Sequence, residues 1–100
     1  MKLIYITLNN SEEARTIGRE LLEKKLANCV NFFPITCMYN YHDEITEEPE
    51  TVLIVKTKAG YFERVKSVVK SHITYDNFIG ELTTTHLNDD FSRWLDEVVK

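Results

Sequence analysis

The side chains with the most reactive chemistry in this sequence are two cysteines, Cys29 and Cys37, and three histidines, His42, His72 and His86. Thiolate and imidazole groups suit copper or zinc, and a Cys–His pair can also act as a nucleophile with its base. No two of the five have the tight spacing of a metal-binding motif, and a lone buried cysteine usually behaves as a small hydrophobe. The residue types therefore permit a metal site or a nucleophile without specifying either.

Motifs that would identify an enzyme are missing from the chain. No P-loop, GxGxxG, HExxH or CxxC sequence occurs, so the signals for nucleotide binding, zinc hydrolysis and thiol exchange are absent. We predict that the protein is not an enzyme, and we assign no catalytic residue. Cys29 and Cys37 are too far apart along one extended segment to form a disulfide, so free thiols are expected, as in a reducing compartment.

Each histidine also has a plain structural interpretation. His72 falls at the C-terminal end of a predicted helix, where a cationic imidazole interacts well with the helix dipole. His86 follows the last predicted strand beside Asn88 and is expected to be solvated. His42 precedes the acidic segment Glu44–Glu50, which is typical of an exposed hairpin tip.

Hydrophobic periodicity predicts the elements that position these residues. Lys2–Leu8 is apolar and β-branched with few breaks, which is typical of a central strand buried on both faces. Asn10 is an N-cap for a helix that runs to about Ala27. Two-fold alternation over Cys29–Tyr41 predicts a long strand, in which Pro34 indicates a bulge or kink.

The second half of the chain completes the pattern. His42–Glu50 is predicted as a turn region, and Thr51–Thr57 as the second strand of a long hairpin. Gly60 opens a second amphipathic helix. Phe78–His86 is predicted as a weaker strand.

A final helix, capped by Asn88 or Asp89, gives the order βαββαβ followed by α. This order is the split βαβ pattern of an α+β, ferredoxin-like sandwich with a C-terminal helix. One hundred residues hold one core, so residues 1–100 are expected to form a single domain. The sheet face without helices must meet water or another copy of the chain, and the aromatic strand through Tyr39 and Tyr41 favours self-association.

Charge and hydropathy exclude several partners. The net charge of −4 and the pI near 5.3 argue against nucleic acid or an anionic membrane as the main partner, because both attract clustered Lys and Arg. The longest apolar run is only a few residues, too short to span a bilayer. The first residues lack the features of a signal peptide, so a cytoplasmic location is expected.

Segments along nearly the whole chain resemble the CutA, or divalent-cation tolerance, family. They are LLEKKLANCVNFFP (21–34), YNYHDEI (39–45), the Lys56-Thr57 strand end, the stretch Ser71 to Tyr75, and FSRWL (91–95). The resemblance implies a homotrimer built through long hairpins, with clefts between subunits and binding of copper or another divalent cation. The cleft residues that it implies are Cys29, Tyr39, Lys56, Tyr75 and Trp94. A PII-like small-molecule-binding signalling module and a structural scaffold without a metal are the alternatives, and no client protein is indicated.

The sequence departs from the metal-binding members of that family at two positions. Ile6 stands where some members have a thiol proposed as a copper ligand, and Ile73 stands where they have a second histidine. His72 is retained, and His86 could join it only if the end of the fourth strand lies beside the end of the second helix. We therefore predict His72 and His86 as candidate metal ligands, with weak or absent copper binding.

Overall fold

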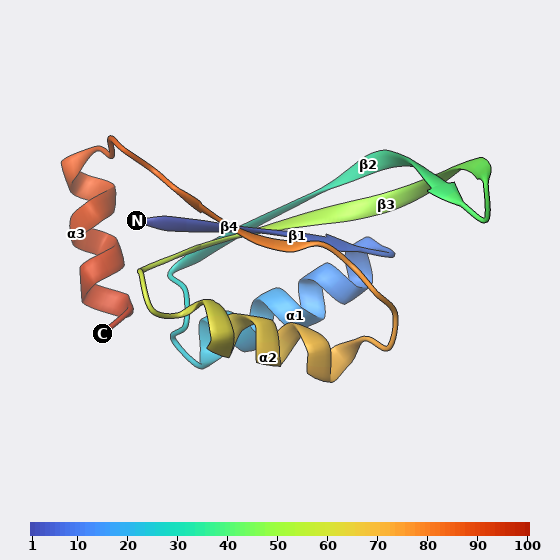
Figure 1. Ribbon diagram of the computed structural model, residues 1–100. Coiled ribbons are helices and arrows are strands. Elements are labelled where there is room, and N and C mark those ends of the chain that lie inside the picture. The colour runs from blue at the N-terminus through green and yellow to red at the C-terminus, as the bar shows by residue number, and fades with distance from the viewer.

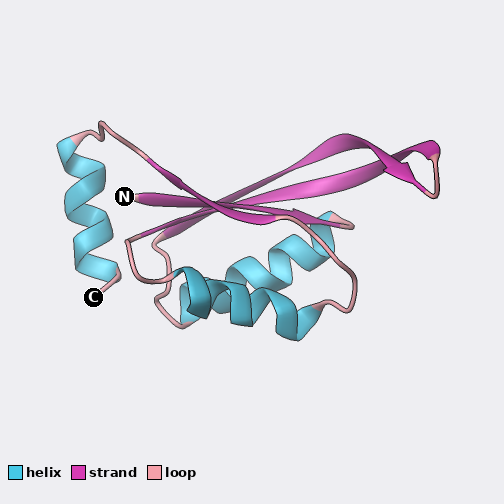
Figure 2. Cartoon of the chain, in the orientation of Figure 1, coloured by secondary structure: helices cyan, strands magenta, loops and turns pink.

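The computed structural model describes residues 1–100 as a four-stranded antiparallel sheet with three helices (Figure 1, Figure 2). The elements are β1 (Lys2–Leu8), α1 (Ser11–Glu23), β2 (Cys29–Tyr41), β3 (Glu44–Thr57), α2 (Phe62–His72), β4 (Ile79–Thr83) and α3 (Asp89–Val98). The strand order is β2-β3-β1-β4. Helices α1 and α2 cover one face, and α3 lies at the end of the sheet near both termini. The predicted α+β, ferredoxin-like arrangement with a C-terminal helix is confirmed.

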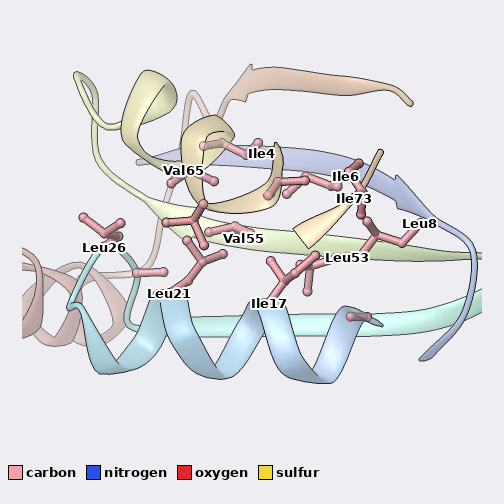
Figure 3. Close-up of a cluster of buried hydrophobic side chains, with 14 residues drawn as sticks. Ile4, Ile6, Leu8, Ile17, Leu21, Leu26, Leu53, Val55, Val65 and Ile73 are labelled. Atoms are coloured by element: carbon pink, nitrogen blue, oxygen red, sulfur yellow. The ribbon is translucent and has the colours of Figure 1, made fainter. Parts of the chain in front are cut away.

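The core fills the space between the sheet and its two covering helices (Figure 3). Alternate residues of β1, Ile4, Ile6 and Leu8, are buried and face Ile17 and Leu21 of α1. The alternation corrects the prediction that β1 is buried on both faces, because its other face carries no helix and is only partly covered. No helix of the chain is both long enough and apolar enough to cross a membrane.

Helix α1 begins where predicted and ends earlier. The Asn10 side chain accepts a hydrogen bond from the Glu13 backbone N–H at 2.9 Å, as an N-cap does. The helix ends at Glu23, not near Ala27, because Lys25 adopts a φ of +57° and turns the chain. The next N–H, that of Leu26, donates back across the turn to the Leu21 carbonyl at 3.0 Å. Glycine is the usual residue in this backbone conformation. Because lysine stands there instead, the sequence carries no signal of where the helix ends.

The β2–β3 hairpin is longer and more regular than predicted. Its register runs unbroken from Cys29 opposite Lys56 to Tyr41 opposite Glu44, so the predicted bulge at Pro34 is wrong. Pro34 is tolerated because β2 is an edge strand. The turn consists of two residues at positive φ, His42 and Asp43, which is the backbone of a type I′ turn.

Two other boundaries also differ from the prediction. Most of the segment His42–Glu50, predicted as a turn region, belongs to β3, which begins at Glu44. Strand β4 covers only Ile79–Thr83 of the predicted Phe78–His86, because β1, its only neighbour, begins at Lys2 opposite Thr83.

The sheet face opposite the helices carries apolar side chains on all four strands. The register places Leu3 and Tyr5 of β1 on this helix-free face, together with Phe33 of β2, Ile54 of β3 and Leu82 of β4. Phe33 is 41% exposed and Leu82 is 56% exposed. A single chain therefore leaves a contiguous apolar surface open to water, which is uncommon for a monomer.

One buried amide in the core region is unpaired. Asn28 is 8% exposed, and neither polar atom of its side chain has a hydrogen-bond partner. A buried polar group without a partner costs about 1–3 kcal/mol, so we expect Asn28→Ala to raise the free energy of unfolding by about 1 kcal/mol in urea denaturation at fixed protein concentration.

Thr57→Val provides the matched control in the same corner of the molecule. The Thr57 hydroxyl is fully buried and donates to the Leu26 carbonyl at 2.7 Å. Its loss leaves that acceptor unpaired, so this variant should lower the free energy of unfolding by about 1–2 kcal/mol. A loss of similar size for Asn28→Ala would contradict the prediction.

Candidate binding sites at the two ends of the sheet

The predicted cleft residues form two separate groups within one chain. Cys29 and Lys56 are direct cross-strand neighbours at the end of the sheet near α3. The Lys56 ammonium lies 5.1 Å from the centroid of the Phe91 ring, and that ring meets Trp94 edge to face at 5.3 Å between centroids. Cys29, Lys56 and Trp94 are therefore gathered at one end of the sheet by the start of β2, the end of β3 and α3.

Tyr39 and Tyr75 lie at the opposite end and line a groove of about 600 Å³, which we call the hairpin groove. One side is the β2–β3 hairpin, and the other is the segment between α2 and β4. The other lining side chains of chemical interest are Cys37, Tyr41, Glu48, Glu50, Asp76 and Phe78. A cleft that unites both groups would need more than one chain, so the predicted intersubunit cleft stays a prediction.

Hydrogen bonds fix the loop that forms one wall of the hairpin groove. The Tyr75 hydroxyl donates to the Glu13 carboxylate at 2.6 Å and accepts from the Asn9 N–H at 3.1 Å. The Asn77 amide donates to the Thr7 carbonyl at 2.8 Å. The loop is thus tied to the end of β1 and the first turn of α1, which gives the groove a defined wall.

Three groups of the groove wall, the Tyr39 and Tyr75 hydroxyls and the Cys37 thiol, have raised pKa values, which favours their neutral forms. The hydrogen bond that Tyr39 donates to the Glu48 carboxylate raises the pKa of Tyr39 to about 12. Burial, followed by the hydrogen bond to Glu13, raises the pKa of Tyr75 above its usual value. Partial burial and the nearby Glu50 carboxylate raise the pKa of the Cys37 thiol, which is the opposite of what a reactive cysteine needs.

His72 is the last residue of α2, as predicted, and it contacts α1. Its Nε2 lies 2.7 Å from the Glu20 carboxylate, which also pairs with Lys24 at 2.8 Å. Hydrogen bonds from Lys24 and then from His72 lower the pKa of Glu20. The imidazole is therefore already engaged between the two helices, and metal coordination through Nε2 would have to displace Glu20.

His86 lies at the other end of the sheet from His72. It follows β4, which runs antiparallel to β1 and ends where the Thr84 N–H donates to the Met1 carbonyl at 3.3 Å. His72, in contrast, lines a depression with Asn10 at the start of α1. The condition for pairing the two histidines is therefore not met within one chain.

The chain contains no group of three or more His, Cys, Asp or Glu side chains that could hold a metal ion. Ile6 is fully buried and Ile73 is 8% exposed, so both belong to the apolar core. The residues of a single chain thus do not fit a copper site at these positions.

Sequence reasoning missed the carboxylates of the hairpin groove. The acidic pattern predicts that Glu48 and Glu50 belong to a solvated hairpin tip, whereas the two residues face the same side of the sheet as Cys37 and Tyr39. Their alternation was the available signal, since residues two apart on a strand share one face. Asp76 had no signal in the sequence, because its place in the wall depends on how the α2–β4 loop folds back.

The raised pKa of Tyr39 gives a test of the groove wall. Because the folded pKa is about 12, its contribution to stability should be full below about pH 10 and should be lost as the pH rises through 12. NMR titration of the tyrosine rings should show this late ionisation, and Glu48→Gln should move it to lower pH. Tyr41→Phe, a control on the same strand, should leave it unchanged; an ordinary Tyr39 pKa near 10 would contradict the contact.

Comparison with known proteins places the chain in a family. A profile described as "CutA1 divalent ion tolerance protein" matches residues 2–98. The divalent-cation tolerance protein CutA of Archaeoglobus fulgidus is 39% identical over 97% of this chain and 96% of that protein. The protein of the same name from Thermus thermophilus is 36% identical over 96% of this chain and 95% of that protein.

Solved structures agree with the sequence comparison. The structure named periplasmic divalent cation tolerance protein CutA, from Archaeoglobus fulgidus, superimposes with a TM-score of 0.94 at 38% identity and covers the whole of both chains. The Thermus thermophilus divalent cation tolerance protein superimposes with a TM-score of 0.91 at 35% identity, again over the whole of both chains. The predicted resemblance is confirmed, and the chain belongs to the CutA1 divalent ion tolerance protein family.

Proposed function

We propose that this chain acts in tolerance of divalent cations as a self-associated homotrimer that binds ligands and performs no catalysis. The observation that carries the proposal is the family match over residues 2–98. A cytoplasmic location is proposed with it, although one relative is named periplasmic. No chemical step is assigned to any residue.

The helix-free face supports self-association. Its exposed apolar side chains, Phe33 and Leu82 among them, would be removed from water by a second copy, at roughly 25 cal/mol for each Å² of apolar surface buried. The hairpin extends well beyond the body of the molecule (Figure 1). Strands β2 and β4 are both free edges, so a repeated head-to-tail contact between different edges can close into a ring.

Cation binding is proposed to be weak. Affinity for copper depends on several soft ligands held in one geometry, whereas His72 is bonded to the Glu20 carboxylate and belongs to no group of three potential ligands. His86 lies at the other end of the chain's sheet and would have to come from a second copy to join His72. Copper or another divalent cation therefore remains the proposed class of ligand, without an assigned coordination sphere.

A PII-like module that binds a small molecule is the second candidate function. The hairpin groove favours it, because one chain supplies a defined hollow of about 600 Å³ with aromatic and carboxylate walls. The presence of this groove argues against a scaffold that binds no ligand.

Self-association is tested by the mass in solution. Light scattering at micromolar concentration should give three times the 11.7 kDa mass of the chain. Phe33→Lys and Leu82→Lys place a charge on the helix-free face and should lower that mass, because obligate interfaces of roughly 2,000 Å² or more are largely apolar. Leu22→Lys, at an exposed position on α1, should leave it unchanged. A wild-type mass near that of one chain would end the proposal.

Copper binding is tested by calorimetric titration of copper(II) into the full-length protein. We expect binding to be weak and to be reduced further by His72→Ala, because one imidazole with one carboxylate makes an incomplete site. His86→Ala should have the smaller effect. Tight stoichiometric binding that disappears in His72→Ala would show instead that the chain has a copper site even with isoleucine at positions 6 and 73.

A further inference from the structure

We propose that Lys56 of one copy forms an ion pair with Glu50 of the next copy in the assembly. The pair rests on the self-association proposed above, in which one copy covers the helix-free face of another. Two features of that face lead to it: the positions of its charged side chains, and the distance that separates them within one chain.

Lys56 is the only basic residue that the register places on the helix-free face. It lies opposite Leu3 of β1 and Cys29 of β2, which are both on that face. Its side chain is half-buried, and its ammonium lies 5.1 Å from the centroid of the Phe91 ring. The ion pairs of the chain do not include Lys56. A second copy on this face would remove water from an unpaired cation, which is costly unless that copy supplies a carboxylate.

Other lysines at the same end of the sheet are engaged within their own chain. Lys58 pairs with the Asp96 carboxylate of α3 at 2.8 Å. Lys2 donates to the Thr83 hydroxyl at 2.6 Å, and it shares the helix-covered face of β1 with Ile4. Lys56 is therefore the cation at this end that lacks a polar partner.

The carboxylates of the helix-free face all lie on the hairpin. Glu44, Glu48 and Glu50 are the only acidic residues that the register places there, because residues two apart on a strand share one face. Glu44 follows the turn and is exposed, and Glu48 already accepts the hydrogen bond of Tyr39. Glu50 is half-buried and has no basic partner in its own chain. It is therefore the carboxylate best placed to accept a cation from another copy.

Lys56 and Glu50 cannot pair within one chain. They share one face of β3, and the rise of roughly 3.3 Å per residue separates their Cα atoms by about 20 Å. Salt screens exposed charges over about 8 Å, so the two barely interact across a single chain. Their separation suits a head-to-tail ring, in which each copy pairs through Lys56 with one neighbour and through Glu50 with the other.

The pair also bears on the hairpin groove, which Glu50 lines. Lys56 of a second copy would neutralise part of its acidic lining and close part of its mouth. A small-molecule site in this groove, the second candidate function, would then be shared by two copies.

The test is an exchange of charges in the full-length protein. The readout is the concentration at which the assembly dissociates, measured by sedimentation over a series of dilutions, with urea at one fixed concentration if the wild type stays assembled. Lys56→Glu and Glu50→Lys each place like charges in the contact and should raise that concentration by about tenfold or more. The double variant restores opposite charges in reversed order and should return to within about threefold of the wild type.

The distance within one chain makes this rescue diagnostic. Substitutions about 20 Å apart with no shared partner normally have independent effects, so the two losses should multiply unless the side chains meet between copies. Glu47→Lys is the matched control, because it makes the same change of charge on the opposite face of β3, where Glu47 lies opposite Met38. It should shift the dissociation by less than about twofold.

Neutral variants provide a second cycle if the charge-reversal variants do not fold, as judged by circular dichroism. Lys56→Met and Glu50→Gln should each weaken the assembly, because each leaves the other charge unpaired in the contact. Their combination should weaken it by less than the product of the two single effects.

Two outcomes would overturn the ion pair while the wild type keeps the mass of three chains. One is a loss in the charge-exchanged variant equal to the product of the two single losses. The other is a shift of less than about twofold in both single variants. A wild-type mass of one chain would instead end the self-association proposal, and this contact with it.

Discussion

The structure depends on the burial of one face of the two central strands against α1 and α2. Ile4, Ile6 and Leu8 of β1 pack with Leu53 and Val55 of β3 beneath the helices, and this layer is the only closed core of the chain. It fixes the direction of β1 and the faces that α1 and α2 turn toward the sheet. Both candidate binding regions lie at the ends of these strands, so their separation follows from the length of the core.

The fold could be predicted from the sequence wherever local chemistry and hydrophobic period agreed. The Asn10 cap and the apolar stripe of α1 specify the start and the face of that helix. The end of α1 could not be predicted, because Lys25 takes a backbone conformation that favours glycine. The first half of β3 could not be predicted as a strand, because the segment Glu44–Glu50 is rich in glutamate and strands usually contain few glutamates. Cross-strand pairing with β2 overrides that preference here.

The candidate site was less predictable, because it depends on which residues meet in three dimensions. The adjacency of Cys29 and Lys56 follows from the hairpin register, and the register follows from a two-residue turn that the sequence did not locate. The hairpin groove requires the α2–β4 loop to return to the end of β1 through Tyr75 and Asn77. Such contacts leave no periodic signal, and only the family resemblance placed Tyr39 and Tyr75 in a cleft in advance.

The pairing of β1 has a consequence for how the chain reaches its native state. Lys2, near the N-terminus, lies between Thr57 of β3 and Thr83 of β4. The first strand to leave the ribosome can therefore pair both of its edges only after nearly the whole chain has been synthesised. Contacts so distant in sequence slow folding relative to a helical bundle of the same size. During that interval its apolar residues are exposed to nonspecific association. The N-cap and the apolar face of α1 are formed by residues close in sequence, so this helix can form early. It would then offer β1 an apolar surface to pack against.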